Sequence, residues 1–223
     1  MSHHSLLKPI ILFDLDGTLT DPWIGITRSI IYALEHLGVA APPARELIWC
    51  IGPPLKESFE KLLGPARKGE AARALELYRV SYEATGMFEN VLYDGIPELL
   101  KRLKTAGAKL CLATSKPRVY AVRILEHFGI DEFFTGVYGS ELDDSRSDKA
   151  EVIAHAVQME HLDPKAAIMV GDREFDVIGA RKNGMDVVGV LWGHGGEAEL
   201  RLAGAMVFAK TPADLARYLI VES

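Results

Sequence analysis

The chain has 223 residues, of which 48% are hydrophobic and 25% are charged. This is an ordinary globular composition, and it excludes disordered, collagen-like and low-complexity proteins. The 25 lysines and arginines and the 31 aspartates and glutamates give a net charge of −6. Because a chain this acidic has no general attraction for polyanions, we expect neither a nucleic-acid polymer nor a membrane surface as a partner.

Cysteine usage and the lack of targeting signals favour a cytoplasmic protein. Cys50 and Cys111 lie far apart among apolar neighbours, which predicts two reduced, buried thiols rather than a disulfide. No uncharged apolar run approaches the ~18 residues that a membrane span requires. The N-terminus lacks the apolar stretch of a signal peptide. The sequence indicates no functional role for His3 or His4.

The first 90 residues combine one strand with a long helical segment. Residues 10–13 form a short apolar run before Asp and Gly, which is typical of a buried parallel strand. From Asp21 the apolar residues recur at helical spacing, with Asp21 as the N-cap of a helix that ends near Gly38. Further helices are predicted near 44–50, over 54–63 and from 65 to about 84, with no convincing strand before Asn90.

After Asp94 and Gly95, helices and strands alternate. Helices are predicted over 96–105, 118–128, 149–159, 175–183 and 212–220, and strands over 108–113, 136–138, 167–170, 186–190 and 205–208. Such alternation predicts right-handed crossover units and hence an α/β fold with a doubly wound, Rossmann-like parallel sheet. We expect residues 1–20 and 91–223 to form this catalytic core. Residues 21–90 are expected to be an inserted helical cap, because a structureless connection of that length would be abnormal.

The ends of the predicted strands carry polar residues, at the edge where an open parallel sheet binds its ligands. Asp14 and Asp16 follow the first strand and, being two residues apart in extended chain, face one small volume, while Gly17 lets the chain turn. Thr114 and Ser115 follow the second strand and offer hydroxyls beside the free N–H groups of a helix start, which suits an anion. Taken singly, the first pair is equally typical of a turn and the second of a helix cap.

Two further strand ends add a cation and a second acidic pair. Lys149 opens a helix after a polar stretch that includes Arg146, although each of these side chains is by itself typical of a solvated surface. Asp172 and Asp176 follow the fourth strand at a spacing of i and i+4, so we expect them to share a helix face. Acids in a first helical turn are also favourable without any ligand.

Together these residues predict one metal site at one edge of the sheet. The carboxyl ends of parallel strands meet at that edge, which brings the four aspartates named above into one volume. Four carboxylates would repel one another strongly in a partly dry site, and a divalent cation removes that repulsion. Mg²⁺ is the expected cofactor because it takes a few carboxylates together with waters and phosphate oxygens.

These motifs resemble those of haloacid-dehalogenase-superfamily phosphatases with a helical cap inserted after the first motif. Residues 14–18 (Asp-Leu-Asp-Gly-Thr) match the first motif, Thr114 or Ser115 the second, Lys149 the third, and Gly171-Asp172 with Asp176 the fourth. Within the superfamily the chain is similar to the phosphoglycolate-phosphatase-like group, and especially to members labelled 5′-nucleotidases, which share residues 139–143 and Arg146. Many phosphoglycolate-phosphatase relatives carry proline after the third-motif lysine, whereas this chain has Ala150, which weakens the transfer of the glycolate substrate.

The resemblance implies a role for each matched residue. Asp14 would attack phosphorus and form an aspartyl-phosphate, and Asp16 would protonate the leaving oxygen and later activate water. Mg²⁺ would be held by Asp14, the backbone carbonyl of Asp16 and Asp172, with Asp176 ligating or orienting a bound water. The phosphoryl oxygens would be bound by Thr114, Ser115, Lys149 and the turn residues Gly17 and Thr18.

The implied activity is the Mg²⁺-dependent hydrolysis of a small phosphate monoester, phosphoglycolate or, alternatively, a nucleoside monophosphate. A sugar-phosphate mutase keeps both aspartates of the first motif and stays open, whereas a receiver-like phosphoacceptor module is only about half this length and has no large helical insertion. The cap is expected to read the leaving group, with residues 51–56 as the specificity loop. Arg28, Lys56 and Arg146 are candidate substrate contacts. Monomer and homodimer are both compatible with the sequence.

Overall fold

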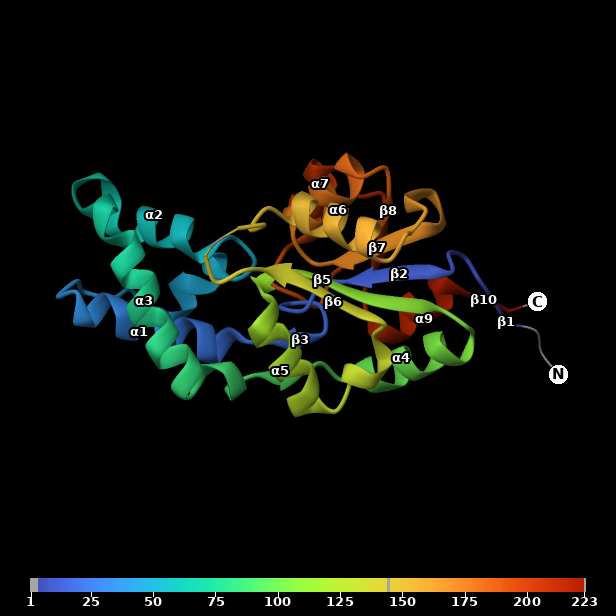
Figure 1. The fold of residues 1–223 in the computed structure, drawn as a ribbon, viewed down its shortest axis with the longest axis horizontal. Helices are drawn as coiled ribbons and strands as arrows, with labels where there is room; N and C mark the ends of the chain where they lie inside the picture. The colour runs from blue at the N-terminus through green and yellow to red at the C-terminus, as the bar shows by residue number, and fades with distance from the viewer. Residues whose placement is uncertain (1–3, 144, 223) are drawn as a thin grey trace. The chain divides into compact units, whose positions relative to one another are not determined.

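The computed structural model describes residues 4–143 and 145–222, so His3 lies outside the described residues. The chain divides into two compact units. The core unit consists of the residues up to Thr20 together with those from Leu92 onward, and the insert unit is Asp21–Val91. In Figure 1 the core unit contains the large sheet, and the insert unit carries the helices labelled α1, α2 and α3.

The core unit is built on a six-stranded parallel sheet with the order β6-β5-β2-β7-β8-β9. Its strands are β2 (Ile10–Phe13), β5 (Lys109–Pro117), β6 (Gly136–Ser140), β7 (Ala167–Gly171), β8 (Asp186–Val190) and β9 (Val207–Ala209). β2 lies between β5 and β7, with Phe13 in register with Leu112 and Val170. The predicted doubly wound sheet is confirmed, and β2 ends in the middle of its carboxyl edge.

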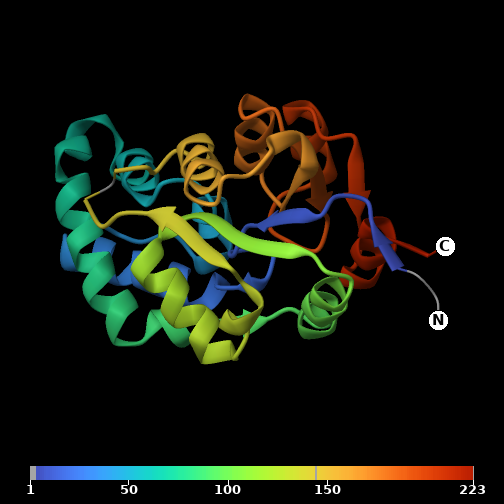
Figure 2. The same cartoon turned by 45° about the vertical axis from the view of Figure 1, so that its right-hand side comes forward.

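Helices cover both faces of this sheet, as Figures 1 and 2 show. They are α4 (Ile96–Thr105), α5 (Arg118–Phe128), α6 (Lys149–Met159), α7 (Glu174–Lys182), α8 (Glu197–Ala203) and α9 (Pro212–Leu219). α6 and α7 pack on one face in a buried cluster that includes Ile153, Leu12 and Met169. α4, α5 and α9 lie on the opposite face. Because β2 is covered on both sides, its continuous apolar run is what a central parallel strand requires.

The core unit differs from the predicted elements in two respects. β5 continues through Thr114 and Ser115 to Pro117, with a register shift against β6 after Ala113, so the expected loop after the second strand is still extended chain. The structure also contains two features that were not predicted, α8 and the antiparallel sheet of β1 (His4–Leu6) with β10 (Ile220–Glu222). α8 has only seven residues, too few for a legible apolar period, and the β1–β10 pairing joins distant parts of the chain.

The insert unit is helical, as expected, but the bounds of its helices differ from the prediction. It contains α1 (Trp23–His36), α2 (Leu55–Arg67), α3 (Ala71–Ala84) and 3₁₀ segments at Ala44–Cys50, Lys68–Glu70 and Gly86–Phe88. The predicted helix over 44–50 is therefore a 3₁₀ helix, and the predicted helix from 65 to 84 is interrupted before α3. A two-stranded sheet pairs β3 (Thr20–Asp21) with β4 (Val91–Leu92).

The core of the insert unit follows from the apolar spacing of its helices. Ile30 and Leu34 of α1 are buried, and the rings of Phe59 and Tyr78 meet edge to face, with centroids 6.2 Å apart. Both cysteines of the chain are free and buried, as predicted, and burial raises the pKa of each thiol. Among the described residues, no helix combines the length and the apolar character needed to cross a membrane.

Candidate active site

The turn after β2 holds the two aspartates of the first motif at the buried middle of the sheet edge. The N–H of Asp14 donates to the carbonyl of Val170 (2.9 Å), so the chain still follows β7 as it leaves the strand. Gly17 has φ +84°, and a Cβ atom there would lie 2.3 Å from a carboxylate oxygen of Asp172. The turn therefore requires glycine. Asp14 and Asp16 are 4% and 7% exposed, so both carboxyl groups lie out of bulk water.

Lys149 is a buried cation that joins three segments of the chain. It is the first residue of α6, where a lysine is normally solvated, yet its side chain is only 3% exposed. Its Nζ lies 2.7 Å from Oδ1 of Asp14 and 2.8 Å from Oδ1 of Asp176, and it donates to the carbonyl of Ala113 (3.0 Å). Burial by itself lowers the pKa of Lys149, but the two carboxylates outweigh it and raise the pKa above its ordinary value. Lys149 is therefore a fixed positive charge beside Asp14.

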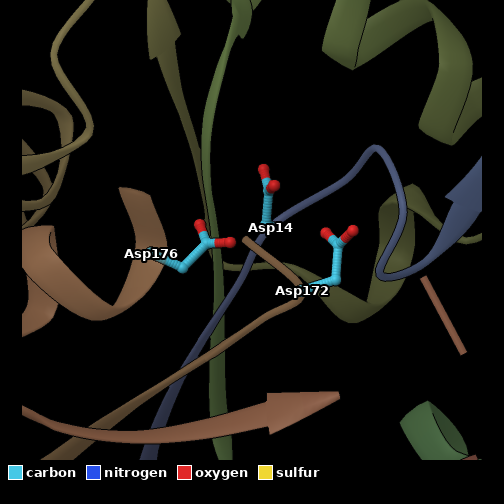
Figure 3. Close-up of side chains that lie close together, drawn as sticks. All are labelled: Asp14, Asp172 and Asp176. Carbon is cyan, nitrogen blue, oxygen red and sulfur yellow. The ribbon is translucent and has the colours of Figure 1, made fainter. Parts of the chain in front are cut away.

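Three buried aspartates, drawn in Figure 3, form a cluster that can hold a metal ion. One carboxylate oxygen of each of Asp14, Asp172 and Asp176 lies within 4.8 Å of the others. Burial raises the pKa of Asp172 to about 8, with further contributions from the charges of Asp176 and Asp14. Burial also raises the pKa of Asp176 to about 6, against the opposing charge of Lys149. Because the cluster holds more acidic groups than Lys149 neutralises, a divalent cation with oxygen ligands fits it.

The expectation that Asp172 and Asp176 share a helix face is wrong, because Asp172 precedes α7. The carboxylate of Asp172 is held from other loops: the hydroxyl of Thr18 donates to its Oδ1 (3.2 Å), and the N–H of His194 donates to its Oδ2 (2.8 Å). The carboxylate of Asp176 instead accepts from the N–H of Arg173 (3.0 Å) in the first turn of α7. The two acids meet through these loop contacts and not through helical periodicity.

The second motif continues β5 and brings an unexpected lysine into the site. Thr114 is buried, and its Oγ1 accepts from the N–H of Lys116 (3.2 Å), while Ser115 is half-buried. Nζ of Lys116 lies 2.8 Å from Oδ2 of Asp16. Lys116 is therefore a site residue that the sequence analysis missed. Lys116 follows the apolar run of β5 but still lies within the extended strand, and this continuation is not visible in the local sequence pattern.

A fifth strand end, after β8, also contributes residues that the sequence analysis did not include. The indole N–H of Trp192 donates to the carbonyl of Thr18 (2.9 Å). The N–H of Gly195, next to that of His194, points to Oδ2 of Asp172 (3.3 Å). Burial raises the pKa of Asp16, against the opposing charges of Lys116 and His194. The rule that all parallel strands end at one edge would have pointed to this loop.

The three candidate specificity residues differ in their contacts. Arg28 forms an ion pair with Glu89 inside the insert unit. Arg146 has a positive φ of 55° and forms an ion pair with Glu141 inside the core unit. Lys56 is exposed on α2 and makes no ion pair with the residues that the structure describes. The charges of the two arginines are therefore matched by acids, whereas that of Lys56 is available to a ligand.

The fold and the site together define a doubly wound α/β protein with buried carboxylates and a buried lysine at the carboxyl edge of its parallel sheet. The family model described as Haloacid dehalogenase-like hydrolase matches residues 11–190. The chain belongs to the haloacid dehalogenase-like hydrolases, and this confirms the family that the motifs predicted.

The chain is similar to several known proteins of this family. A Pseudomonas aeruginosa protein named 5′-nucleotidase is 46% identical over 201 residues, which are 90% of each chain. A Mycobacterium tuberculosis protein named Tyrosine-protein kinase PtkA is 43% identical over 187 residues, which are 83% of this chain and 63% of that protein. The crystal structure of a predicted phosphatase from Clostridium acetobutylicum has 43% identity and a TM-score of 0.91, and the match covers 95% of this chain and 97% of that one.

A more distant relative, a phosphoglycolate phosphatase of Psychrobacter arcticus, is 27% identical over 202 residues, which are 87% of this chain and 88% of that protein. These likenesses confirm the prediction of an enzyme of the phosphatase group. The relative named 5′-nucleotidase has a higher sequence identity to this chain than the relative named phosphoglycolate phosphatase.

Proposed function

We propose that the protein is a Mg²⁺-dependent phosphate-monoester hydrolase that acts on a small phosphorylated metabolite through an aspartyl-phosphate on Asp14. The observation that carries the proposal is the 2.7 Å contact between Asp14 and the buried ammonium of Lys149. A fixed cation beside Asp14 holds the attacking carboxylate in place and offers the transferred phosphoryl group a positive partner. Asp16 supplies a second carboxyl group for proton transfer.

The reaction takes place in two displacements at phosphorus. In the first, an oxygen of Asp14 bonds to phosphorus as the bond to the ester oxygen breaks, and the proton of Asp16 moves to the departing oxygen. In the second, a water oxygen attacks phosphorus and gives a proton to Asp16, while the bond from phosphorus to Asp14 breaks and phosphate leaves. Burial raises the pKa of Asp16 above its ordinary value, which supports the protonated form that the first step needs.

The remaining site residues bind the phosphoryl group and the cation. Phosphoryl oxygens would be bound by Thr114, Ser115 and Lys149, with the turn residues Gly17 and Thr18 beside them. The N–H groups of Gly17 and Thr18 donate to the carbonyls of Thr20 (2.7 Å) and Leu15 (3.2 Å). Mg²⁺ would be held by Asp14, the carbonyl of Asp16 and Asp172, with Asp176 ligating or orienting a bound water. When bound, the ion offsets the negative charge of the phosphoryl oxygens. The hydroxyl contact of Thr18 with Asp172 supports an additional role for Thr18 in orienting this carboxylate.

Binding of Mg²⁺ is expected to release protons and to weaken as the pH falls below 8. The pKa of Asp172 is about 8 without a metal, so at pH 7 this carboxyl group holds a proton that the cation must displace. Asp176, with a pKa of about 6, also becomes protonated at lower pH, and the cation must then displace a second proton. The apparent affinity should therefore fall by up to about tenfold per pH unit between pH 8 and 6. Isothermal titration calorimetry in two buffers of different ionisation enthalpy measures both the affinity and the protons released.

Two variants control this experiment. Asp172→Asn removes the titrating carboxyl group, and it is expected to bind Mg²⁺ weakly without the proton release of the unchanged protein. Asp94→Asn changes an exposed acid before α4 and is expected to bind Mg²⁺ as the unchanged protein does. Equal affinities at pH 6 and pH 8 would contradict the raised pKa of Asp172 as the cause.

The substrate class is inferred from the relatives and from the residue after Lys149. The relative with 46% identity is named 5′-nucleotidase, whereas the relative named phosphoglycolate phosphatase has 27% identity. Ala150, in place of the proline expected beside Lys149 in many phosphoglycolate-phosphatase relatives, agrees with this order. We therefore favour a nucleoside monophosphate over phosphoglycolate as the substrate.

A panel of phosphate esters assayed with Mg²⁺ and ranked by kcat/KM tests the proposal. It includes nucleoside monophosphates, phosphoglycolate, sugar phosphates and para-nitrophenyl phosphate. Release of inorganic phosphate that depends on the metal is expected, and turnover of the panel without metal would contradict the mechanism. Isomerisation of a sugar phosphate without release of phosphate would instead identify a mutase.

The name of the mycobacterial relative provides a second acceptor to test. An aspartyl-phosphate on Asp14 can pass its phosphoryl group to water or to a tyrosine hydroxyl. Incubation with ATP labelled at the γ-phosphate and a tyrosine peptide separates these outcomes. We expect any transferred label in inorganic phosphate, and label on the peptide would favour a kinase.

We infer that residues 51–56 of the insert unit contribute to the choice of substrate, with Lys56 as the candidate contact. Its charge is not matched by an acid among the described residues, unlike those of Arg28 and Arg146. Lys56→Ala is expected to raise KM by about tenfold for esters with a second negative charge, the effect of losing ~1.4 kcal/mol of binding. The KM for para-nitrophenyl phosphate serves as the control. An unchanged KM for every accepted ester would exclude this role.

A further inference from the structure

A second buried lysine lies in the site, and it contacts Asp16 rather than Asp14. Nζ of Lys116 lies 2.8 Å from Oδ2 of Asp16, and the two side chains are 6% and 10% exposed. Lys149, by contrast, pairs with Asp14 and Asp176. Lys116 thus contacts the proposed acid and base, whereas Lys149 contacts the proposed nucleophile, and the four matched motifs do not include Lys116.

The backbone around Lys116 is fixed at the edge of the sheet. Its N–H donates to Oγ1 of Thr114 (3.2 Å), and the carbonyl of Ser115 accepts from the hydroxyl of Ser140 on β6 (2.8 Å). Pairing of β5 with β6 resumes at Pro117, whose ring restricts the backbone further. A side chain that starts from such a backbone can hold its partner in one place.

The ion pair leaves the other oxygen of Asp16 available. Oδ1 of Asp16 is buried and accepts no hydrogen bond from the residues that the structure describes. A buried carboxylate oxygen without a donor is costly unless a ligand supplies one. We propose that Lys116 is a positioning residue, which holds Oδ2 of Asp16 so that Oδ1 faces the oxygen with which Asp16 exchanges its proton. This inference rests on the proposed function, in which Asp16 is the acid and the base.

A lysine can hold Oδ2 of Asp16 throughout the reaction, because the proton is gained and lost at Oδ1. When Asp16 has given its proton to the leaving oxygen, its ionised carboxylate keeps the charge-assisted hydrogen bond from Nζ. When a proton arrives from the attacking water, it bonds to Oδ1 while Oδ2 still accepts from Nζ. The ammonium group of Lys116 has donors only, so it does not accept the proton itself.

A comparison of two leaving groups distinguishes a positioning role of Lys116 from direct binding of phosphate by Lys116. para-Nitrophenolate leaves without a proton, whereas an alkoxide needs one. In Lys116→Met we expect single-turnover cleavage of the best alkyl ester of the panel to slow by about 10²-fold, the lower end of a typical general-acid contribution. The first release of para-nitrophenolate should change by less than about threefold, because it does not use the acid. Attack of water still needs Asp16, so later turnovers are expected to slow and to reveal a burst of product.

A double-mutant cycle with Asp16→Asn tests whether Lys116 acts through Asp16. Lys116→Met should slow the alkyl ester by about 10²-fold in the otherwise unchanged enzyme, but by less than about twofold in the Asp16→Asn background. Lys116→Arg keeps the charge and moves the donors, and it is expected to show the same leaving-group dependence with a smaller loss. This variant keeps the test decisive if Lys116→Met does not fold. Lys101→Met, exposed on α4, is the matched control and should leave both rates unchanged.

Three outcomes would overturn this inference. The first is an equal loss with both leaving groups together with weaker competitive inhibition by inorganic phosphate, which would make Lys116 a phosphate ligand. The second is a double-mutant cycle in which the rate losses of Lys116→Met and Asp16→Asn multiply, which would show that the two residues act independently. The third is an unchanged rate of alkyl-ester cleavage in Lys116→Met. Retained turnover in Asp14→Asn would instead overturn the proposed function, so the two failures can be distinguished.

Discussion

Replacement of Asp14 by asparagine is expected to abolish the Mg²⁺-dependent release of phosphate from para-nitrophenyl phosphate, with kcat falling on the order of 10⁴-fold or more. The amide has nearly the shape of the carboxyl group but lacks its charge and its nucleophilic oxygen. The 2.7 Å ion pair with Lys149 is lost as well. A continuous assay of para-nitrophenolate release, with and without Mg²⁺, measures the effect.

The fold of the Asp14→Asn variant is expected to persist, because Lys149 keeps Asp176 as a counter-ion at 2.8 Å. Circular dichroism and thermal unfolding check this. Asp94→Asn removes an exposed carboxylate of the same core unit and should retain the wild-type kcat. A folded Asp14→Asn variant that kept a substantial part of the wild-type kcat would exclude Asp14 as the nucleophile.

The position of the site could be predicted because the sequence shows where the strands around it end. Short apolar runs before Asp14 and Asp172 predicted β2 and β7, and in the structure these strands are adjacent and in register. Two aspartates that end neighbouring parallel strands must lie close together, whatever the connecting segments do. The alternation of strands and helices predicted the parallel sheet and its shared carboxyl edge, whereas the order of the strands comes from the structure.

Contacts made by long or irregular segments could not be predicted in the same way. A lysine at a helix start reads as a solvated residue, and only the fold shows that Lys149 lies between two carboxylates. Lys116 was missed because β5 continues past its apolar run, and the loop of Trp192 and His194 was missed because it carries no acidic motif. Side-chain reach and loop path depend on tertiary packing, which local spacing does not encode.

The net charge of −6 predicts little about this site, because the local charges are nearly balanced. Lys116 pairs with Asp16, and Lys149 pairs with Asp14 and Asp176. Burial raises the pKa of Asp172 to about 8, so this carboxyl group is largely uncharged at neutral pH in the metal-free protein. A divalent cation would add two positive charges. An anionic phosphate ester can therefore enter a site whose potential differs in sign from that of the whole chain.

Lys149→Met is expected to lower kcat by on the order of 10²–10³-fold, the usual loss when a group that stabilises transition-state charge is removed. The variant also leaves Asp14 and Asp176 buried without their ammonium partner. Breaking such a pair typically costs about 3–5 kcal/mol of unfolding free energy. Lys182→Met is the control, because Lys182 is exposed on α7 and lies 3.7 Å from Asp148.

The stability loss in Lys149→Met should depend on pH, and its sign distinguishes an electrostatic role from a packing role. Lys149 lowers the pKa of Asp176, so its removal moves that pKa above about 6. Between the ordinary pKa of an aspartate and this raised value, the folded variant binds a proton that the unfolded chain has lost, so its stability falls as the pH rises. Urea unfolding at pH 5.5 and pH 8.5 should therefore show a larger deficit relative to wild type at pH 8.5. A deficit of equal size at both pH values would mean that the methionine disturbs packing and that the ammonium charge contributes nothing.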